Sequence, residues 1–233
     1  MTIKEGYEET ERRIRAAAER SGRRREDITL IAVTKTRTPE EINEVIKCGA
    51  TDIGENKPQE VRDKFAGVEG DVKWHMIGRL QTNKIKYIID KVSLIHSVDS
   101  IHLMDEIDKH AKRHDLVMPI LIQVNISGEE SKQGVTAEEL PLLLEHAGEL
   151  ENIRVDGLMT IAPKIEGNVT NKLHFDNIHK IFVDMGRKKY DNVNMRCLSM
   201  GMSGDFETAI ECGATMVRVG TAIFGERDYS KSV

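Results

Sequence analysis

Eight short apolar runs, separated by stretches with helical spacing, recur along the chain and constrain its fold more than any other feature. Strands that alternate with helices form parallel βαβ units with right-handed crossovers, and eight such units close a barrel. We therefore predict an α/β fold, a (β/α)8 TIM barrel, and the 233 residues of the chain suit one such barrel. An open, doubly wound sheet is the alternative. The eight runs lie at residues 28–35, 52–55, 73–77, 94–98, 118–126, 153–160, 197–202 and 216–220.

The segments around these runs predict an extra N-terminal helix and a repeated type of helix ending. Residues 3–20 place apolar side chains on one helical face, and Ser21-Gly22 follow as a stop signal. Two later helical segments each end in Cys-Gly-Ala-Thr, at residues 48–51 and 212–215, where glycine can take a left-handed conformation. No linker rich in proline, glycine or serine interrupts the pattern, so we predict a single domain over residues 1–233.

Composition and charge argue against several classes of partner. The formal net charge is -5, and the one tight basic run, Arg23 to Arg25, is followed at once by Glu26 and Asp27. We therefore expect no nucleic-acid partner. No stretch approaches the roughly 20 apolar residues that cross a bilayer, so we expect no membrane contact. The three cysteines show neither metal-ligand spacing nor a paired framework, which predicts a cytoplasmic protein without a metal site. We take it to be a monomer.

Lys35 closes the first apolar run, directly after Leu30–Thr34. Lysine is depleted in strands and costly to bury, so its position at the end of a strand indicates a pocket that uses the amine. The most direct use is as a nucleophile that forms a Schiff base with a carbonyl group. The alternative is a lysine whose stem lies along the strand end while its charge stays in water.

Small and polar residues also follow other predicted strands, at the end of a barrel where ligands bind. Ser203 comes after the seventh run, and Gly220-Thr221 end the eighth. Hydroxyl groups and unobstructed backbone amides bind phosphate, often in the loops after strands seven and eight of a barrel. Ordinary helix capping by Ser203 and a plain turn at Gly220 are the alternative interpretations.

Arg218 helps to choose the ligand. The first and last strands of a closed barrel are neighbours, so Lys35 would face the phosphate-binding loops, as pyridoxal 5'-phosphate or a sugar-phosphate aldolase requires. Arg218 lies two residues before Gly220, on the same strand face, and could donate to the pyridine nitrogen of pyridoxal phosphate. A surface ion pair is the alternative for Arg218. His75, in an apolar strand, is expected to be a hydrogen-bonded core residue rather than a ligand-binding one.

Seven motifs, in order along nearly the whole chain, resemble those of the pyridoxal phosphate homeostasis proteins, the YggS-like or PROSC-like family. The resemblance implies a barrel similar to the N-terminal domain of alanine racemase. It also implies a role in intracellular pyridoxal phosphate (vitamin B6) homeostasis, with apo enzymes that need the cofactor as transient acceptors. The motifs are Ala32–Thr36, Gly54–Glu60, Trp74–Lys84, Val124–Ser127, Gly157–Ile161, Leu198–Asp205 and Val217–Gly225.

The same resemblance implies a cofactor site. Lys35 would hold pyridoxal phosphate as an internal aldimine, Arg218 would face the ring nitrogen, and Asn56 would line the pocket. The phosphate group would be held by Ser203, Gly220 and Thr221.

Catalytic turnover is expected to be low or absent. A racemase of this kind needs a second acid/base group on the opposite face of the cofactor, which alanine racemase takes from a second domain that we do not expect here. The four tyrosines, Tyr7, Tyr87, Tyr190 and Tyr229, lie in helical or terminal segments rather than at strand ends. We therefore favour a non-catalytic carrier or regulator. The alternatives are a weak amino-acid racemase or lyase that uses pyridoxal phosphate, and a Schiff-base aldolase.

Overall fold

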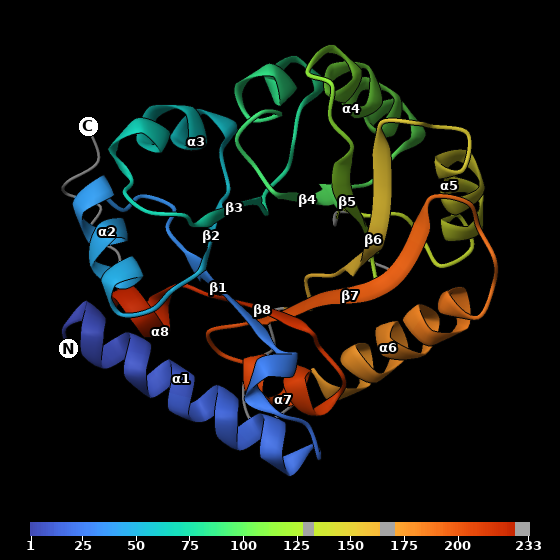
Figure 1. Cartoon of the computed structure of the whole chain (residues 1–233). Helices are drawn as coiled ribbons and strands as arrows, with labels where there is room; N and C mark the ends of the chain where they lie inside the picture. The colour runs from blue at the N-terminus through green and yellow to red at the C-terminus, as the bar shows by residue number, and fades with distance from the viewer. Residues whose placement is uncertain (128–132, 164–170, 227–233) are drawn as a thin grey trace.

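Eight parallel strands close into a barrel with helices around it (Figure 1). The structure is a computed structural model and describes residues 1–127, 133–163 and 171–226. Because β1 pairs in parallel with both β2 and β8, the ring is closed, which confirms the predicted (β/α)8 barrel and excludes the open sheet. The strands are β1 (Thr29–Val33), β2 (Asp52–Glu55), β3 (Lys73–Met76), β4 (Leu94–Val98), β5 (Met118–Gln123), β6 (Ile153–Met159), β7 (Val193–Met202) and β8 (Met216–Val219).

The end of β1 differs from the prediction in a way that concerns Lys35. The strand ends at Val33, so Lys35 lies in the turn beyond it and is not the last residue of the strand. The last bond to β2 runs from the Thr34 N–H to the Gly54 carbonyl. The chain then turns, because Thr36 takes a left-handed backbone conformation with φ 66°.

β5 and β7 also differ in length from the predicted runs. β5 ends at Gln123 instead of residue 126, because the Asn125 N–H bonds to the Val135 carbonyl and leaves the barrel ladder. β7 begins at Val193 instead of residue 197. Its first residues alternate between exposed and half-buried positions, so the apolar pattern that marks the rest of the strand is missing there.

Helices connect the strands on the outside of the ring (Figure 1). Between β3 and β4 the connection contains a 3₁₀ helix, Thr82–Tyr87, in place of an α-helix. As predicted, a left-handed glycine follows the ends of α2 and α7, Gly49 with φ 111° and Gly213 with φ 98°. Among the described residues, no helix is long and apolar enough to span a membrane. The α-helices are α1 (Ile3–Arg20), α2 (Pro39–Lys47), α3 (Pro58–Lys64), α4 (Ile101–Arg113), α5 (Leu140–Ala147), α6 (Lys172–Gly186), α7 (Phe206–Glu211) and α8 (Thr221–Phe224).

The predicted N-terminal helix, α1, packs on the outside of the barrel beside α7 and α8 (Figure 1). It begins after Thr2, whose hydroxyl accepts from the Glu5 N–H in a capping box. Gly6 allows α1 to lie against α8, because a Cβ atom at this position would stand 2.3 Å from the Ile223 carbonyl oxygen. The contact therefore requires glycine.

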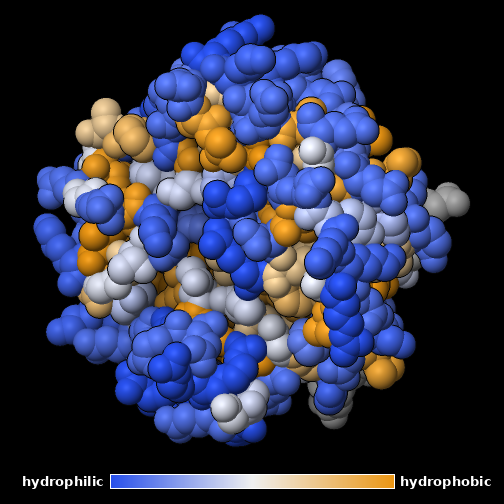
Figure 2. All heavy atoms as spheres, turned by 45° about the vertical axis from the view of Figure 1, so that its right-hand side comes forward, coloured by the Kyte–Doolittle hydropathy of each residue, from blue (hydrophilic) through white to orange (hydrophobic). Residues whose placement is uncertain are grey.

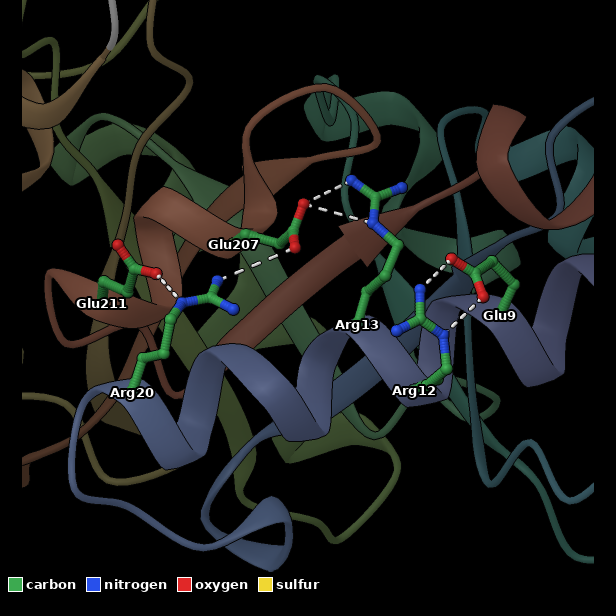
Figure 3. Close-up of polar contacts among 6 residues, drawn as sticks. All are labelled: Glu9, Arg12, Arg13, Arg20, Glu207 and Glu211. Atoms are coloured by element: carbon green, nitrogen blue, oxygen red, sulfur yellow. Dashed lines mark hydrogen bonds and ion pairs between the residues drawn. The ribbon is translucent and has the colours of Figure 1, made fainter.

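Ion pairs also join α1 to α7 (Figure 3). Arg13 pairs with Glu207 at 2.5 Å, and Arg20 pairs with Glu211 at 2.6 Å. Pairs as exposed as these contribute little to stability. The buried apolar face of α1 therefore supplies most of the attachment energy.

The buried apolar side chains of the described residues form two clusters. The larger one lies between the strands and the surrounding helices, and the smaller one, Leu94, Leu121 and Met159, lies inside the barrel. Because side chains alternate along a strand, His96 shares the inward face with Leu94. On the face of the molecule seen in Figure 2, hydrophobic residues form separate small groups among hydrophilic ones.

Candidate functional site

A cavity of about 770 Å³ opens at the carboxyl ends of the strands, the end at which barrel enzymes bind their ligands. Its wall includes residues that follow β1, β2, β7 and β8. These segments are far apart in the sequence, so closure of the barrel, and not local sequence, brings them together. All six residues singled out from the sequence line this one cavity: Lys35, Asn56, Ser203, Arg218, Gly220 and Thr221.

The turn that carries Lys35 is held on both sides by carboxylates. Before Lys35, the Thr34 hydroxyl donates to Glu55 Oε1 at 2.7 Å. After it, the Thr36 backbone N–H donates to Glu60 Oε2 at 2.7 Å. The two contacts hold the backbone on both sides of Lys35 in place.

Lys64 joins these carboxylates into one unit, which we call the Glu55–Lys64–Glu60 cluster. The Lys64 Nζ lies 2.9 Å from Glu55 Oε1 and 2.7 Å from Glu60 Oε2. Burial raises the pKa of Glu55 to about 7, although Lys64 favours the ionised form. Burial also acts on Glu60, but hydrogen bonds from Lys64 and the Thr36 backbone outweigh it and lower the pKa of Glu60. The charge of the cluster therefore changes near neutral pH.

Ser203 lies directly after β7 and contacts the start of α8. The helix that follows it, α7, has Asp205 at its N-cap, so the interpretation of Ser203 as the cap of that helix is wrong. The Ser203 Oγ instead accepts from the backbone N–H groups of Gly220, at 3.1 Å, and Ala222, at 3.4 Å. Two backbone N–H groups at the start of α8 therefore hold Ser203 beside Thr221 in the cavity wall.

Arg218 is the buried cation of the site, with 4% of its surface exposed. Its interpretation as a surface ion pair is therefore wrong. Nη1 donates to Ser199 Oγ at 2.6 Å, and Nη2 donates to the Thr160 carbonyl at 2.9 Å. Burial lowers the pKa of Arg218 to about 10, against the attraction of Asp205, so the side chain remains a cation at neutral pH.

Sequence reasoning missed several polar residues of the cavity wall, chiefly Arg37, Asn171 and Asp205. Arg37 lies with its guanidinium carbon 5.3 Å from the centre of the Phe224 ring. Asn171 donates to Asp205 Oδ2 at 2.8 Å. Arg37 could have been predicted from the sequence, because it lies only two residues after Lys35. Asn171 precedes α6 and carries no comparable local signal.

His75 is a buried, hydrogen-bonded core residue, as expected, and it does not line the cavity. Its Nε2 lies 2.8 Å from Asp52 Oδ1, and its Nδ1 lies 2.9 Å from His96 Nε2. Sequence reasoning did not connect it with His96. In the part of the chain that the structure describes, no group of three His, Cys, Asp or Glu side chains could hold a metal ion.

Tyr229, one of the four tyrosines considered in the sequence, lies outside the described residues. The other three tyrosines, Tyr7, Tyr87 and Tyr190, do not line the cavity.

Comparisons with known proteins show the family. The model of the alanine racemase N-terminal domain family matches residues 8–228. A protein of Aquifex aeolicus named pyridoxal phosphate homeostasis protein is 47% identical over 218 residues, which are 93% of this chain and 95% of that protein. The chain belongs to the pyridoxal phosphate homeostasis protein family. This confirms the resemblance found in the motifs.

Solved structures share the fold of this family member. An unknown protein from Bifidobacterium adolescentis matches with a TM-score of 0.90 and 37% identity, over 95% of this chain and 94% of that one. PipY of Synechococcus elongatus PCC7942, solved with pyridoxal phosphate bound, matches with a TM-score of 0.78 and 30% identity. That match covers 85% of this chain and 93% of PipY.

Proposed function

We propose that this protein binds pyridoxal 5'-phosphate and takes part in the intracellular homeostasis of this cofactor, with little or no catalytic turnover. The name of the Aquifex relative and the pyridoxal phosphate in PipY support the proposal. The observation that carries it belongs to this chain. One cavity wall combines an amine, a pair of hydroxyl groups beside a glycine, and a buried guanidinium, which suit the aldehyde, phosphate and ring nitrogen of the cofactor.

The phosphate group fits the wall formed by Ser203, Gly220 and Thr221. The hydroxyl groups of Ser203 and Thr221 would donate to its oxygens, and the N–H groups of Gly220 and Ala222 hold Ser203 in place by donating to its Oγ. Gly220 packs closely against β1, because a Cβ atom at this position would stand 3.3 Å from Val33 Cβ. Binding through such donors needs no direct counter-ion.

The ring and aldehyde of the cofactor fit the remaining groups. Arg218 would donate to the ring nitrogen and, as a cation, disfavour a proton there. Lys35 Nζ would add to the aldehyde carbon and release water, which leaves a C=N bond between protein and cofactor. Asn56 would line the pocket beside this bond. When bound, the cofactor supplies an electron-accepting ring, and an unprotonated ring nitrogen weakens that capacity.

Low turnover agrees with the groups in the wall. Racemisation needs a second acid/base group opposite the lysine. Among the described wall residues, the carboxylate that could serve as this group is that of Asp205. Its oxygens already accept hydrogen bonds from the Met202 N–H and the Asn171 side chain. We therefore favour a monomeric, cytoplasmic carrier that passes pyridoxal phosphate to apo enzymes.

The visible absorbance spectrum tests the binding claim. Wild-type protein mixed with pyridoxal phosphate should show the band of a lysine-bound cofactor, and Lys35→Ala should lack it. Lys57→Ala is the matched control, because Lys57 follows the neighbouring strand but is exposed and does not line the cavity. A band that survives in Lys35→Ala would contradict the assignment of Lys35, and absence of binding by the wild type would contradict the proposed function and favour an aldolase.

Transfer and turnover assays separate the carrier from the enzyme alternatives. The holo form should activate an apo enzyme that needs pyridoxal phosphate, and it should show no racemisation of amino acids above the rate of free cofactor. Racemisation or cleavage of amino acids that Lys35→Ala abolishes would instead show an enzyme.

A further inference from the structure

A chain of five polar residues runs through the interior of the barrel, where aliphatic side chains are usual. Asp52 Oδ1 lies 2.8 Å from His75 Nε2, and His75 Nδ1 lies 2.9 Å from His96 Nε2. His96 Nδ1 lies 3.0 Å from Ser199 Oγ, which accepts from Arg218 Nη1 at 2.6 Å. Each of the five residues is less than a tenth exposed. We call this set the Asp52–Arg218 chain.

The Asp52–Arg218 chain crosses the barrel from one end to the other. His96 is on β4 and Ser199 is on β7, which are not neighbours in the ring, so their contact spans the interior. Asp52 is the first residue of β2 and lines a second cavity, of about 700 Å³, beside α1. Arg218 lines the candidate cofactor cavity at the opposite ends of the strands.

The two end residues of the Asp52–Arg218 chain determine which atoms carry the hydrogens of its hydrogen bonds. Arg218 can only donate. Burial would raise the pKa of Asp52, but hydrogen bonds from His75 and Thr51 outweigh it and lower that pKa, so Asp52 is an accepting carboxylate. His75 must then donate from Nε2 and, when neutral, accept at Nδ1.

His96 completes the same pattern. It donates from Nε2 to His75 and accepts at Nδ1 from the Ser199 hydroxyl, so that every donor in the chain has one acceptor. Burial, together with the charge of Arg218, holds the pKa of His96 well below its usual value, which agrees with a neutral ring. The proton of Arg218 stays on Arg218, because its pKa of about 10 far exceeds that of Asp52. The chain is therefore a fixed, polarised support and does not conduct protons.

We propose that Asp52, His75, His96 and Ser199 are positioning residues for Arg218, with both histidines neutral and protonated at Nε2. This inference rests on the proposed function, in which Arg218 faces the ring nitrogen of pyridoxal phosphate. The hydrogen bonds of Arg218 go to a hydroxyl and a carbonyl and not to a carboxylate. The chain supplies a distant negative end for the buried cation and fixes its orientation.

Nitrogen-15 NMR of the cofactor-free protein tests the first half of the proposal. Long-range nitrogen–proton spectra of histidine-labelled protein should show His75 and His96 as neutral Nε2–H tautomers around neutral pH. Their signals are assigned by their loss in His75→Gln and His96→Gln. An imidazolium or an Nδ1–H tautomer at either residue would overturn the hydrogen pattern, and this result does not depend on cofactor binding.

Ser199→Ala tests the second half, because it removes the hydroxyl that accepts from Arg218 Nη1 with a small change in volume. Ser97→Ala is the matched control. Ser97 is also buried, and its hydroxyl donates to the Gly78 carbonyl, which is not part of the Asp52–Arg218 chain. Ser199→Ala should raise the Kd for pyridoxal phosphate about tenfold and shift the nitrogen-15 signal of the labelled cofactor ring, whereas Ser97→Ala should leave both unchanged.

The outcomes separate this inference from the proposed function. A wild type that does not bind the cofactor would overturn the proposed function together with the role of Arg218. A wild type that binds normally, with equal effects of Ser199→Ala and Ser97→Ala or with no ring shift in either, would overturn the positioning role alone.

Discussion

At the scale of single residues, the surroundings of Lys35 depend on Glu55. The Glu55 side chain is fully buried, and its Oε2 has no hydrogen-bond partner among the described residues. Its other oxygen, Oε1, accepts from both Thr34 and Lys64. A carboxyl group in this position holds the turn before Lys35, but its ionised form is costly because of burial. The stability of the protein should therefore depend on pH through Glu55.

Glu55→Gln should remove part of this pH dependence. The pKa of Glu55 is raised from 4.5 to about 7, so between these values the folded protein binds more protons than the unfolded chain, and the free energy of unfolding falls as pH rises. When the pH is raised from about 5 to about 8, the free energy of unfolding of the wild type should fall by on the order of 2 kcal/mol more than that of Glu55→Gln. Urea unfolding at the two pH values measures this difference.

Glu60→Gln is the control with the opposite sign. The pKa of Glu60 is lowered, so Glu60 stabilises the fold above its unfolded pKa and this contribution is lost as pH falls. Glu60→Gln should therefore lose stability at about pH 8 relative to wild type. Equal pH dependence in wild type and Glu55→Gln would contradict the assignment to Glu55.

Single residues of the candidate site were predictable where a charged side chain occurs in or beside an apolar run. Lys35 stood out because it follows such a run, and Arg218 because it precedes Gly220 by two residues on the same strand face. His96 lies in a similar run, Leu94–Val98, but its partners come from two other strands, and the barrel must close before they meet. The polar chain could not be derived from local sequence for this reason.

At the scale of elements, α1 supports the part of the site that we assign to phosphate. Gly6 of α1 lies against the Ile223 carbonyl of α8, and α8 begins at Thr221, directly after Gly220. A displacement of α8 would therefore move the backbone donors at its start. The bounds of α1 were predictable from its amphipathic pattern and its stop signal, whereas this contact was not, because Gly6 carries no side-chain signal.

Gly6→Ala should destabilise the protein and weaken pyridoxal phosphate binding. Alanine favours a helix by about 1 kcal/mol over glycine, but its Cβ would stand 2.3 Å from a backbone carbonyl that cannot rotate away. Overpacking of this kind costs roughly 1–3 kcal/mol and should exceed the gain. Urea unfolding and a cofactor titration measure the two effects.

Glu8→Ala serves as the control for this prediction. Glu8 is exposed on the same helix and pairs with Lys4 at 3.8 Å, a contact that contributes little. Its replacement should leave stability and affinity almost unchanged. Unchanged stability in Gly6→Ala as well would show that α1 does not support α8.

At the scale of the whole molecule, barrel closure makes the site. Pairing of β1 with β8 brings the turn after the first strand beside the loops after the last two. The alternation of strands and helices predicted this architecture. The same closure joins Asp52 at one end of the barrel to Arg218 at the other, through residues that no short segment contains. The proposed function of the protein therefore depends on the binding of the cofactor by Lys35 in this shared cavity.

Borohydride reduction of the protein with bound pyridoxal phosphate, followed by peptide mapping, tests this binding most directly. Reduction converts the C=N bond into a stable amine, so the modified lysine can be identified by mass spectrometry. We predict a pyridoxyl group on Lys35. A reduced, cofactor-bearing protein that carries the group on another lysine, with Lys35 unmodified, would contradict the account.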